Sequence, residues 1–529
     1  MGYYLPNSFQ QRIPFCLGEN LVDDDNEINP AYARTVLNYS IDSARRVILR
    51  GGRAKISQKI PNVRFISPMA YTSTAIPPVR EYFWGTNGGA IYKHDVNGQL
   101  LTLQSLGSAT LTPGKKLRPI NFNGKLLVCN GTDTELQYDG SSWSTLSTGL
   151  SERFIDWVVA KNRIYAISAT RLYWCALNGE TNWTAASGEN DPNSRVVQTS
   201  FPTLEGDELV SVATVGDFVV VFGRNTMVVY SIDLDQRSNA PFKAIPGVGI
   251  VATRAYVNAG SLFFWSTNGG WREFLEALTG ETIELEKKSP IRKNEPRLRQ
   301  RLEFMRGAGL LDNIHCGVQA RESRLITCYP RNTDGTGVEF YIYNFTEDVT
   351  AWFRWNNHPV FSFMVDHNGD ILAGGNEYVY VLDTTPDKSG RVYDEGGPIG
   401  GTTGAIWEPP FLFGKDKREK IFHTLGLVME NRSDVNIGYE AFTDYGGRDS
   451  HPITKQTLVM PDSGYKYAET VGKPGSKYGA AVYAESGSGR REKEFGIEGA
   501  GINYKPRFRY QGNVSHRFLD VAIKGEIVV

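Results

Sequence analysis

Residues 123–138 read NGKLLVCNGTDTELQY: a tight Asn-Gly turn, an apolar run, a second polar turn and a run that ends in tyrosine. An Asn-Gly pair between such runs is a strong signal for a β-hairpin, because both residues accept the positive φ angles of a type I′ turn. The same order of turn and run recurs along the chain, with turns at 161–162, 216–217, 259–260, 322–323 and 368–370. Each copy therefore predicts one small antiparallel sheet.

The copies are spaced by about 40 to 60 residues. Each has an aromatic-rich partner run, at 136–138, 172–174, 227–230, 271–274, 340–343 and 378–380, and residues 82–84 with 90–92 form a less regular seventh copy. Small twisted sheets at this spacing bury their faces only against neighbouring sheets, as the blades of a propeller do. We therefore predict an all-β chain: an irregular β-propeller of about six to seven blades with a second, C-terminal antiparallel β domain.

The composition agrees with an all-β protein. The 529 residues include 55 Gly and 12% aromatic residues but only 7 Met, which favours strands and turns over helices. The 57 basic and 58 acidic residues nearly cancel, so no global basic field indicates nucleic-acid binding. The five cysteines form no Cys-x-x-Cys pair, which is typical of reduced thiols in a cytoplasmically made protein. We find no secretion signal, and no apolar run approaches the roughly 20 residues that span a bilayer.

The repeat pattern also divides the chain. Residues 1–75 lack the pattern, and we expect them to form an N-terminal arm that packs on other elements. Residues 76–390 form the predicted propeller, with a basic insertion at 284–306. Residues 391–408 are rich in Gly, Thr and Pro, as linkers often are. Alternating strands then predict a sandwich-like domain for oligomerisation or docking at 409–529.

The basic insertion is the main candidate for a functional site. Asn294-Glu295-Pro296 is typical of a helix start, so we predict a short basic helix there. Two functions are open for it, a contact with DNA in a channel and a contact between subunits, and a solvated loop or ion-pair face is the simpler alternative. Its basic residues are Lys287, Lys288, Arg292, Lys293, Arg297, Arg299, Arg301 and Arg306.

Catalytic motifs are missing from the sequence. There is no G-x-S-x-G, P-loop, H-E-x-x-H or dinucleotide fingerprint, and the seven histidines lack metal-ligand spacing. Residues 266–271 resemble the Asp-box turn of sialidase propellers, but Asn268 replaces the acid, so we interpret the stretch as a hairpin turn. Carboxylate pairs that cleave glycosidic bonds are defined by their separation in space, which a sequence leaves open. We expect no enzymatic activity, no metal and no cofactor.

The tryptophans have two interpretations, as core residues between blades or as platforms for sugar stacking. Their spacing along the blades favours the core, and exposed side chains would favour the sugar interpretation. The residues concerned are Trp84, Trp143, Trp157, Trp174, Trp183, Trp265, Trp271, Trp352 and Trp355.

Four stretches resemble one protein family. Residues 206–232 read GDELVSVATVGDFVVVFGRNTMVVYSI, and residues 246–253 read PGVGIVAT. Both are similar to the central propeller segment of the packaged-DNA stabilisation proteins, or tail nozzles, of short-tailed bacteriophages (podoviruses). Residues 410–430 resemble the start of that family's second β domain, and residues 518–529 resemble its closing strand. The insertion at 284–306, the glycine-rich stretch at 472–500 and the N-terminal arm depart from the family.

The resemblance implies a structural role in the virion tail, after synthesis in the cytoplasm of the host bacterium. Members of this family form a homohexameric ring below the head-to-tail adaptor, extend the DNA channel, retain the packaged genome and let it pass. The implied partners are further copies of the chain, the adaptor or portal complex, tail fibre, tailspike or needle proteins, and double-stranded DNA without sequence specificity. No small-molecule substrate is implied.

Two other functions stay open. A tail-associated propeller that binds or cleaves polysaccharide would need clustered acids and exposed aromatic residues on the axial face. A generic protein-interaction propeller would hold a partner by its loops and form no ring. No sequence feature favours the second of these.

Overall fold

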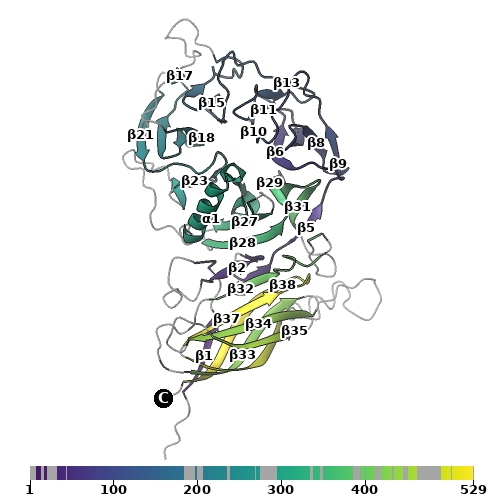
Figure 1. Ribbon diagram of the computed structural model, residues 1–529, viewed down its shortest axis with the longest axis vertical. Coiled ribbons are helices and arrows are strands. Elements are labelled where there is room, and N and C mark those ends of the chain that lie inside the picture. The colour runs from purple at the N-terminus through teal and green to yellow at the C-terminus, as the bar shows by residue number, and fades with distance from the viewer. Residues whose placement is uncertain are drawn as a thin grey trace, which may run out of the picture. The chain divides into compact units, whose positions relative to one another are not determined.

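The protein is all-β, as the sequence predicts, and is described here from a computed structural model (Figure 1). It divides into two compact units, of which one comprises residues 55–339 and 358–381 and the other residues 1–54, 340–357 and 382–529. The structure describes residues 7–13, 17–20, 32–42, 45–183, 197–198, 207–234, 239–267, 270–274, 295–333, 337–345, 350–384, 394–395, 397–409, 412, 418, 420–431, 434–444, 451–460, 490–501 and 503–527.

Six small sheets in the first unit are arranged as the blades of a β-propeller (Figure 1). The first sheet consists of β6 (Phe65–Thr72), β7 (Arg80–Thr86), β8 (Ile91–Asp95) and β9 (Leu100–Leu103). The second consists of β10 (Arg118–Phe122), β11 (Lys125–Cys129), β12 (Leu136–Tyr138) and β13 (Trp143–Thr145). The third consists of β14 (Asp156–Ala160), β15 (Arg163–Ile167), β16 (Leu172–Trp174) and β17 (Val197–Gln198). The next three are β18 (Leu209–Val215), β19 (Phe218–Gly223), β20 (Thr226–Ser231) and β21 (Ala240–Pro246); β22 (Tyr256–Asn258), β23 (Leu262–Trp265) and β24 (Trp271–Phe274); and β29 (Val360–Val365), β30 (Ile371–Gly375) and β31 (Val379–Thr384).

The predicted turns join the first two strands of these sheets. Asn123 and Gly124 have φ angles of 49° and 72° between β10 and β11, and Lys161 and Asn162 have 47° and 57° between β14 and β15. Gly369, at φ 86°, lies between β29 and β30. Positive φ angles at two adjacent residues match the right-handed twist of the flanking strands, so these short sequences specify their hairpins locally.

Two further segments complete the ring of blades. The first is the predicted copy with its turn at 322–323, which does not form a small sheet of its own, and the second, residues 56–63, is marked by no repeat pattern. The hairpin of β25 (His315–Gln319) and β26 (Arg324–Pro330) places β25 between β22 and β29, so innermost strands from seven positions surround the axis: β6, β10, β14, β18, β22, β25 and β29. Residues 56–63 link the last sheet to the first, since the amide of Ile56 donates to the Val379 carbonyl at 2.9 Å and the amide of Gln58 donates to the Gln99 carbonyl at 2.9 Å. Two short 3-10 helices, Leu311–Asn313 and Ala320–Glu322, flank β25.

The propeller core lies between neighbouring blades. Leu127 and Cys129 of one blade pack with Trp157 and Ile164 of the next, and Tyr165 packs with Val219 of the blade after that. Phe65 and Trp84 of the first sheet share a cluster with Leu372 and Val379 of the last. Burial of apolar surface on both faces of each sheet holds the ring together, because no single blade could bury its faces alone.

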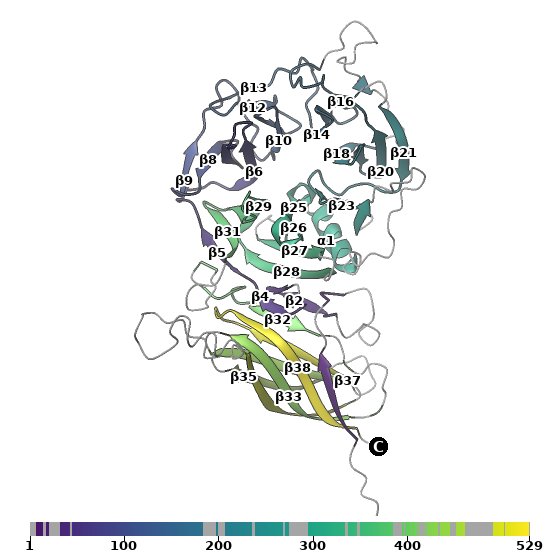
Figure 2. The same cartoon turned by 180° about the vertical axis from the view of Figure 1, so that it is seen from behind.

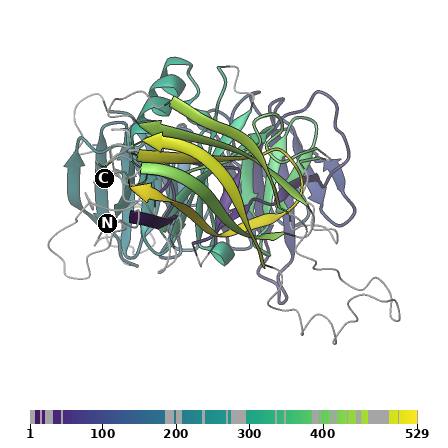
Figure 3. The ribbon, with the colours of Figure 1, turned by 90° about the horizontal axis from the view of Figure 1, so that it is seen from below.

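The second unit holds two sheets with long strands (Figure 2). In one of them, β3 (Tyr39–Ile41), β4 (Val47–Leu49), β38 (His516–Ile527), β33 (Lys420–Asn431) and β36 (Arg490–Gly501) follow in order, and β1 (Asn7–Ile13) also pairs with β38. In the other, β27 (Val338–Phe345) and β28 (Thr350–His358) are followed by β2 (Thr35–Leu37), β32 (Ala405–Glu408), β37 (Asn503–Tyr510), β34 (Val435–Asp444) and β35 (His451–Met460). Figure 3 shows strands β33 to β38 from below, in green and yellow.

The two sheets of this unit face each other across an aromatic core. Phe422 of β33 lies 4.4 Å from Tyr504 of β37, and Phe518 of β38 lies 4.9 Å from Trp407 of β32, measured between ring centroids. Aromatic side chains contribute large buried areas and pack edge to face or at a tilt at such distances. The arrangement is therefore sandwich-like.

The limits of the two units differ from the predicted boundaries at 75, 390 and 408. Residues 1–54 supply strands β1 to β4 to the second unit, whereas residues 55–75 begin the propeller unit. Residues 340–357 also belong to the second unit, and the predicted linker at 391–408 ends in strand β32. Strand pairing between segments that are hundreds of residues apart decides these limits, and a local repeat pattern carries no information about it.

Candidate functional site

The predicted basic helix is present. Helix α1 spans Glu295–Gly307, with Pro296 in its first turn, where the missing amide proton costs nothing. Its C-terminus closes as a Schellman motif, in which the Leu310 amide donates to Met305 and the Gly309 amide donates to Arg306. Gly309 has φ +67°, which suits glycine at this position. Of the eight predicted site residues, α1 contains Arg297, Arg299, Arg301 and Arg306, and Lys287, Lys288, Arg292 and Lys293 lie outside the described residues.

Helix α1 has one apolar face and one basic face. Leu298, Leu302 and Met305 are buried, and their spacing of four and three residues places them on one stripe. Arg299 and Arg306 are exposed, while Arg297 and Arg301 are partly buried. The apolar stripe fixes the helix on the propeller unit, so the arginines are held by a rigid element.

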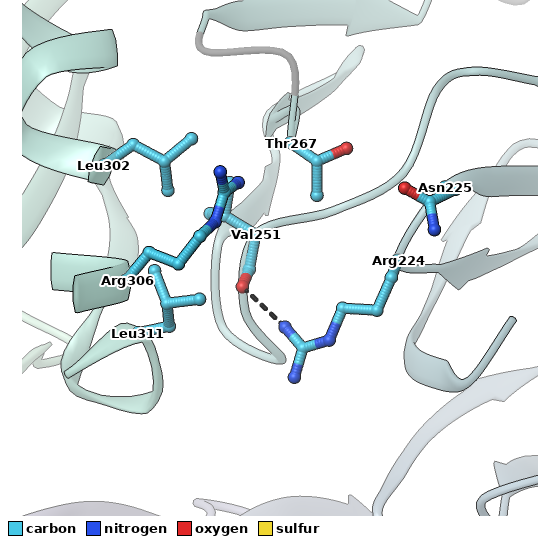
Figure 4. A pocket seen from close by; sticks show the side chains of 7 residues that line it. All are labelled: Arg224, Asn225, Val251, Thr267, Leu302, Arg306 and Leu311. Atoms are coloured by element: carbon cyan, nitrogen blue, oxygen red, sulfur yellow. Dashed lines mark hydrogen bonds between the residues drawn. The ribbon is translucent and has the colours of Figure 1, made fainter. Parts of the chain in front are cut away.

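A pocket of about 460 Å³ lies between α1 and the neighbouring blades (Figure 4). Arg306 reaches it from the helix, and Arg224 reaches it from the turn between β19 and β20. The Arg224 side chain is fixed by a hydrogen bond from its Nη1 to the Val251 carbonyl at 3.0 Å. The turn itself is fixed by Asp207, which accepts a hydrogen bond from the Asn225 amide at 3.1 Å. The lining residues are Arg224, Asn225, Val251, Thr267, Leu302, Arg306 and Leu311.

Among the described lining residues two carry guanidinium groups and none is acidic, so this part of the pocket is positively charged. Guanidinium groups bind carboxylates and phosphates through paired charge-assisted hydrogen bonds. Thr267 contributes a hydroxyl, and the described lining residues include no serine, cysteine, histidine or carboxylate. The arrangement can therefore hold an anionic group of a partner.

Sequence reasoning identified Arg306 but missed Arg224. Arg224 belongs to the turn Gly223-Arg224-Asn225, in a stretch that the sequence marks as a blade hairpin. Hairpin geometry directs a basic residue in a two-residue turn toward the surface, where it can contact a ligand. This position in the turn is the sequence signal that could have identified Arg224 as a candidate site residue. Its proximity to α1 depends on the packing of the insertion.

Six of the seven histidine side chains lie within the described part of the chain, four of them buried and two exposed. His94, His315, His358 and His516 are buried, and His367 and His423 are exposed. In the part of the chain that the structure describes, no three His, Cys, Asp or Glu side chains gather as metal ligands. The predicted hairpin turn at 266–271 is flanked by β23 and β24, which pair through Trp265 and Trp271.

All nine tryptophans that could have stacked on sugars are buried, at 5% exposure or less. Trp183 packs on Phe154 at 4.7 Å and Trp143 packs on Phe83 at 5.4 Å, between ring centroids. Their side chains therefore form the core, and the interpretation as sugar platforms is wrong for these nine.

Within the described ranges, no helix has both the length and the apolar composition that a membrane crossing requires. Compared with models of known protein families and with curated proteins, the chain matches none.

Proposed function

We propose that this chain is a structural subunit of a short-tailed bacteriophage tail, of the nozzle type. In this proposal, copies of the chain form a homohexameric ring below the head-to-tail adaptor, which extends the DNA channel, retains the packaged genome and allows its ejection. The role requires no catalysis. Its partners are the adaptor, tail fibre, tailspike or needle proteins, and duplex DNA that passes without sequence readout.

The pairing of β33 with β38 is the observation that carries the proposal. Residues 410–430 and 518–529 are separated by almost a hundred residues, and each resembles the second β domain of the nozzle family. In the structure β33 and β38 pair antiparallel from Lys420 opposite Ile527 to Asn431 opposite His516. Two stretches that resemble one family thus form adjacent strands of one sheet. This pairing supports a common origin for the whole sheet.

The family-like stretch at 206–232 also corresponds to one structural piece. Residues 209–231 form the consecutive strands β18, β19 and β20, which pair in order within a single blade. A blade and a second β domain that both resemble the same family support the same assignment.

The charge of the chain suits a conduit. The formal net charge is -1, from 57 basic and 58 acidic residues. Each phosphate that a protein neutralises adds affinity through counterion release, so a strongly basic wall would hold the DNA that must move past it. A head-to-tail ring also needs a broad contact surface, which a second β unit can provide.

The test is the assembly state of the full chain. We expect negative-stain electron microscopy and mass photometry to show six-fold rings, either for the purified protein or after addition of its adaptor. A protein that stays monomeric at micromolar concentration and does not bind the adaptor would overturn the proposal. Release of reducing ends from host capsule or lipopolysaccharide would instead indicate a depolymerase.

A further inference from the structure

Four basic residues lie on or next to three innermost strands of the propeller. Lys116 precedes β10, Arg118 begins β10, Arg254 precedes β22, and His315 begins β25. They come from three positions of the ring and are separated by up to about 200 residues in sequence. Nothing in the local sequence indicates that they meet.

Two contacts through Arg254 bring these residues together. Its guanidinium Nη2 donates a hydrogen bond to the carbonyl of Leu117, which lies between Lys116 and Arg118. Its own carbonyl accepts a hydrogen bond from the amide of Cys316, the residue after His315, at 3.0 Å. The His315 ring packs on Phe363 of β29, with 4.9 Å between ring centroids. We name Lys116, Arg118, Arg254 and His315 the axial basic cluster.

Three polar atoms of the axial basic cluster are buried and have no hydrogen-bond partner among the described residues: Lys116 Nζ, Arg118 Nη1 and His315 Nδ1. The Arg118 and His315 residues are only 8% and 9% exposed. Buried polar groups are nearly always hydrogen-bonded, and a buried charge without a partner is strongly unfavourable. Three such atoms in one cluster indicate that a hydrogen-bond acceptor belongs there.

The nearby acidic groups balance the cluster only in part. Asp156 of β14 is buried and accepts hydrogen bonds from the Ser211 hydroxyl at 2.7 Å and the Val212 amide at 3.1 Å. Asp312 is exposed. Burial raises the pKa of Asp156 to about 6, although Arg118 opposes that rise. Below pH 7 the cationic side chains of Lys116, Arg118 and Arg254 outnumber these two acidic groups, so positive charge remains.

The cationic groups also repel one another. Burial, together with Arg118 and Arg254, lowers the pKa of Lys116 to about 7, although Cys328 and Asp312 oppose this. Burial and Arg118 lower the pKa of Arg254 to about 9, against Asp156 and Tyr256. Burial lowers the pKa of His315, and so do Arg254, Lys116 and Arg118. An anion among these groups would relieve the repulsion and favour their protonated forms.

We propose that the axial basic cluster is a binding site for a small oxyanion, in which Lys116 Nζ, Arg118 Nη1 and Arg254 are the principal ligands. Phosphate and carboxylate groups both present the acceptor oxygens that such donors bind. The anion has two chemical sources, free inorganic phosphate or the carboxylate of an acidic sugar. The proposal does not depend on the nozzle function, since the site is complete within one chain.

The experiment measures binding of inorganic phosphate to the full-length protein by isothermal titration calorimetry in phosphate-free buffer at pH 6.5. A second arm uses N-acetylneuraminate, with the neutral sugar N-acetylmannosamine as its control. The test variant is Lys116→Met, because the Nζ of Lys116 has no hydrogen-bond partner among the described residues, and its removal leaves no described acceptor unpaired. The matched control is Lys115→Met, which removes an exposed lysine one residue away.

We expect wild-type protein and Lys115→Met to bind one anion per chain, and Lys116→Met to bind it about 10- to 100-fold more weakly, since one charge-assisted hydrogen bond is lost. Tighter binding of phosphate than of N-acetylneuraminate would assign the site to phosphate, and the reverse order would assign it to acidic sugars. In buffer without either anion, Lys116→Met should be at least as stable as wild type, because a buried charge without a partner has been removed.

A second measurement needs no variant. Sulfate keeps its charge between pH 6 and 8.5, so its affinity for wild-type protein should fall as Lys116 loses its proton near pH 7. Absence of binding of phosphate, sulfate and N-acetylneuraminate at 10 mM would overturn the proposal. Unchanged affinity in Lys116→Met, or binding of sulfate that does not vary with pH, would also overturn it. Anion binding and ring assembly are measured in separate experiments, so the failure of one proposal leaves the other standing.

Discussion

Arg50 and Asp394 form a buried, two-point ion pair within the second unit, although 344 residues separate them in the sequence. Arg50 Nη1 donates to Asp394 Oδ1 at 3.0 Å, and Nη2 donates to Oδ2 at 2.6 Å. The side chains are 1% and 2% exposed. Arg50 also donates from Nε to the Asn38 side chain at 3.1 Å, and the Gly400 amide donates to Asp394 at 3.1 Å. The pair therefore ties the N-terminal strands to the segment that precedes β32.

Removal of one partner from this pair should destabilise the protein strongly. Asp394→Asn leaves the Arg50 charge buried without its counterion, which costs about 3–5 kcal/mol of unfolding free energy. Urea unfolding, followed by circular dichroism, measures the loss. Glu494→Gln is the control in the same unit, because the Glu494–Lys524 pair is about half exposed on both sides and contributes at most about 1 kcal/mol. Equal losses in the two variants would contradict the structural role of the Arg50–Asp394 pair.

Acid should destabilise the second unit through His516. Its Nδ1 donates to the Val514 carbonyl at 3.0 Å, and its Nε2 accepts from the Tyr39 hydroxyl at 3.1 Å, so the neutral ring is fully paired. Burial lowers the pKa of His516 to about 4. Between pH 6.5 and 4 the unfolded chain therefore binds a proton that the folded chain does not. Unfolding free energy should fall by about 3 kcal/mol as the pH drops through this window.

Substitution of His516 isolates this effect from other titrating groups. In His516→Gln the loss of unfolding free energy between pH 6.5 and pH 4 should be smaller than in wild type by about the same 3 kcal/mol. A series of urea unfolding curves at these pH values measures the difference. His423→Gln is the control, since the His423 side chain is 49% exposed. A pH profile of His516→Gln that matches wild type would show that His516 is not the group responsible.

Gly249 should tolerate no side chain. A Cβ atom at this position would lie 2.0 Å from the carbonyl oxygen of Arg224 and 2.2 Å from its carbonyl carbon. Both are backbone atoms, which move only with the β19–β20 turn that presents Arg224 to the pocket. Gly249→Ala should therefore destabilise the propeller unit by roughly 1–3 kcal/mol, in thermal and urea unfolding. A stable Gly249→Ala protein would mean that this turn approaches Gly249 less closely.

Gly307→Ala is the matched control for that change. Gly307 ends helix α1, and a Cβ atom there would have no neighbour within 4 Å. Because alanine is the better helix former, this variant should be unchanged or stabilised by up to about 1 kcal/mol. The two glycines thus distinguish backbone crowding from a general effect of added side chains.

The arginines of α1 allow the two predicted roles of the basic helix to be separated. Arg297, Arg299 and Arg301 lie outside the buried stripe of Leu298, Leu302 and Met305, so their replacement by alanine should leave the helix folded. We expect the triple variant to lose one of two properties. Loss of genome retention in particles with intact rings would indicate a DNA contact, and loss of rings would indicate a contact between subunits. Retention of both properties would mean that the basic face is only solvated.

Local sequence patterns were sufficient for six of the seven predicted copies and for the basic helix, whereas the copy with its turn at 322–323 forms no small sheet of its own. Asn123-Gly124 and Lys161-Asn162 each define a hairpin with their own φ angles, and Pro296 marks the start of α1. These features depend on residues within a few positions of one another, and local sequence acts directly on them. The buried tryptophans also followed from their spacing along the blades.

Tertiary structure alone decided which distant segments meet. The N-terminal strands join β32 and β38, residues 56–63 close the ring beside Val379, and Arg254 brings Lys116 and Arg118 close to His315. None of these contacts has a local signal, because strand pairing between distant segments and burial of charge are determined by the whole packed chain. The sequence by itself determined the kind of small sheet this protein repeats, and only the packed fold placed basic groups from separate blades around one axis.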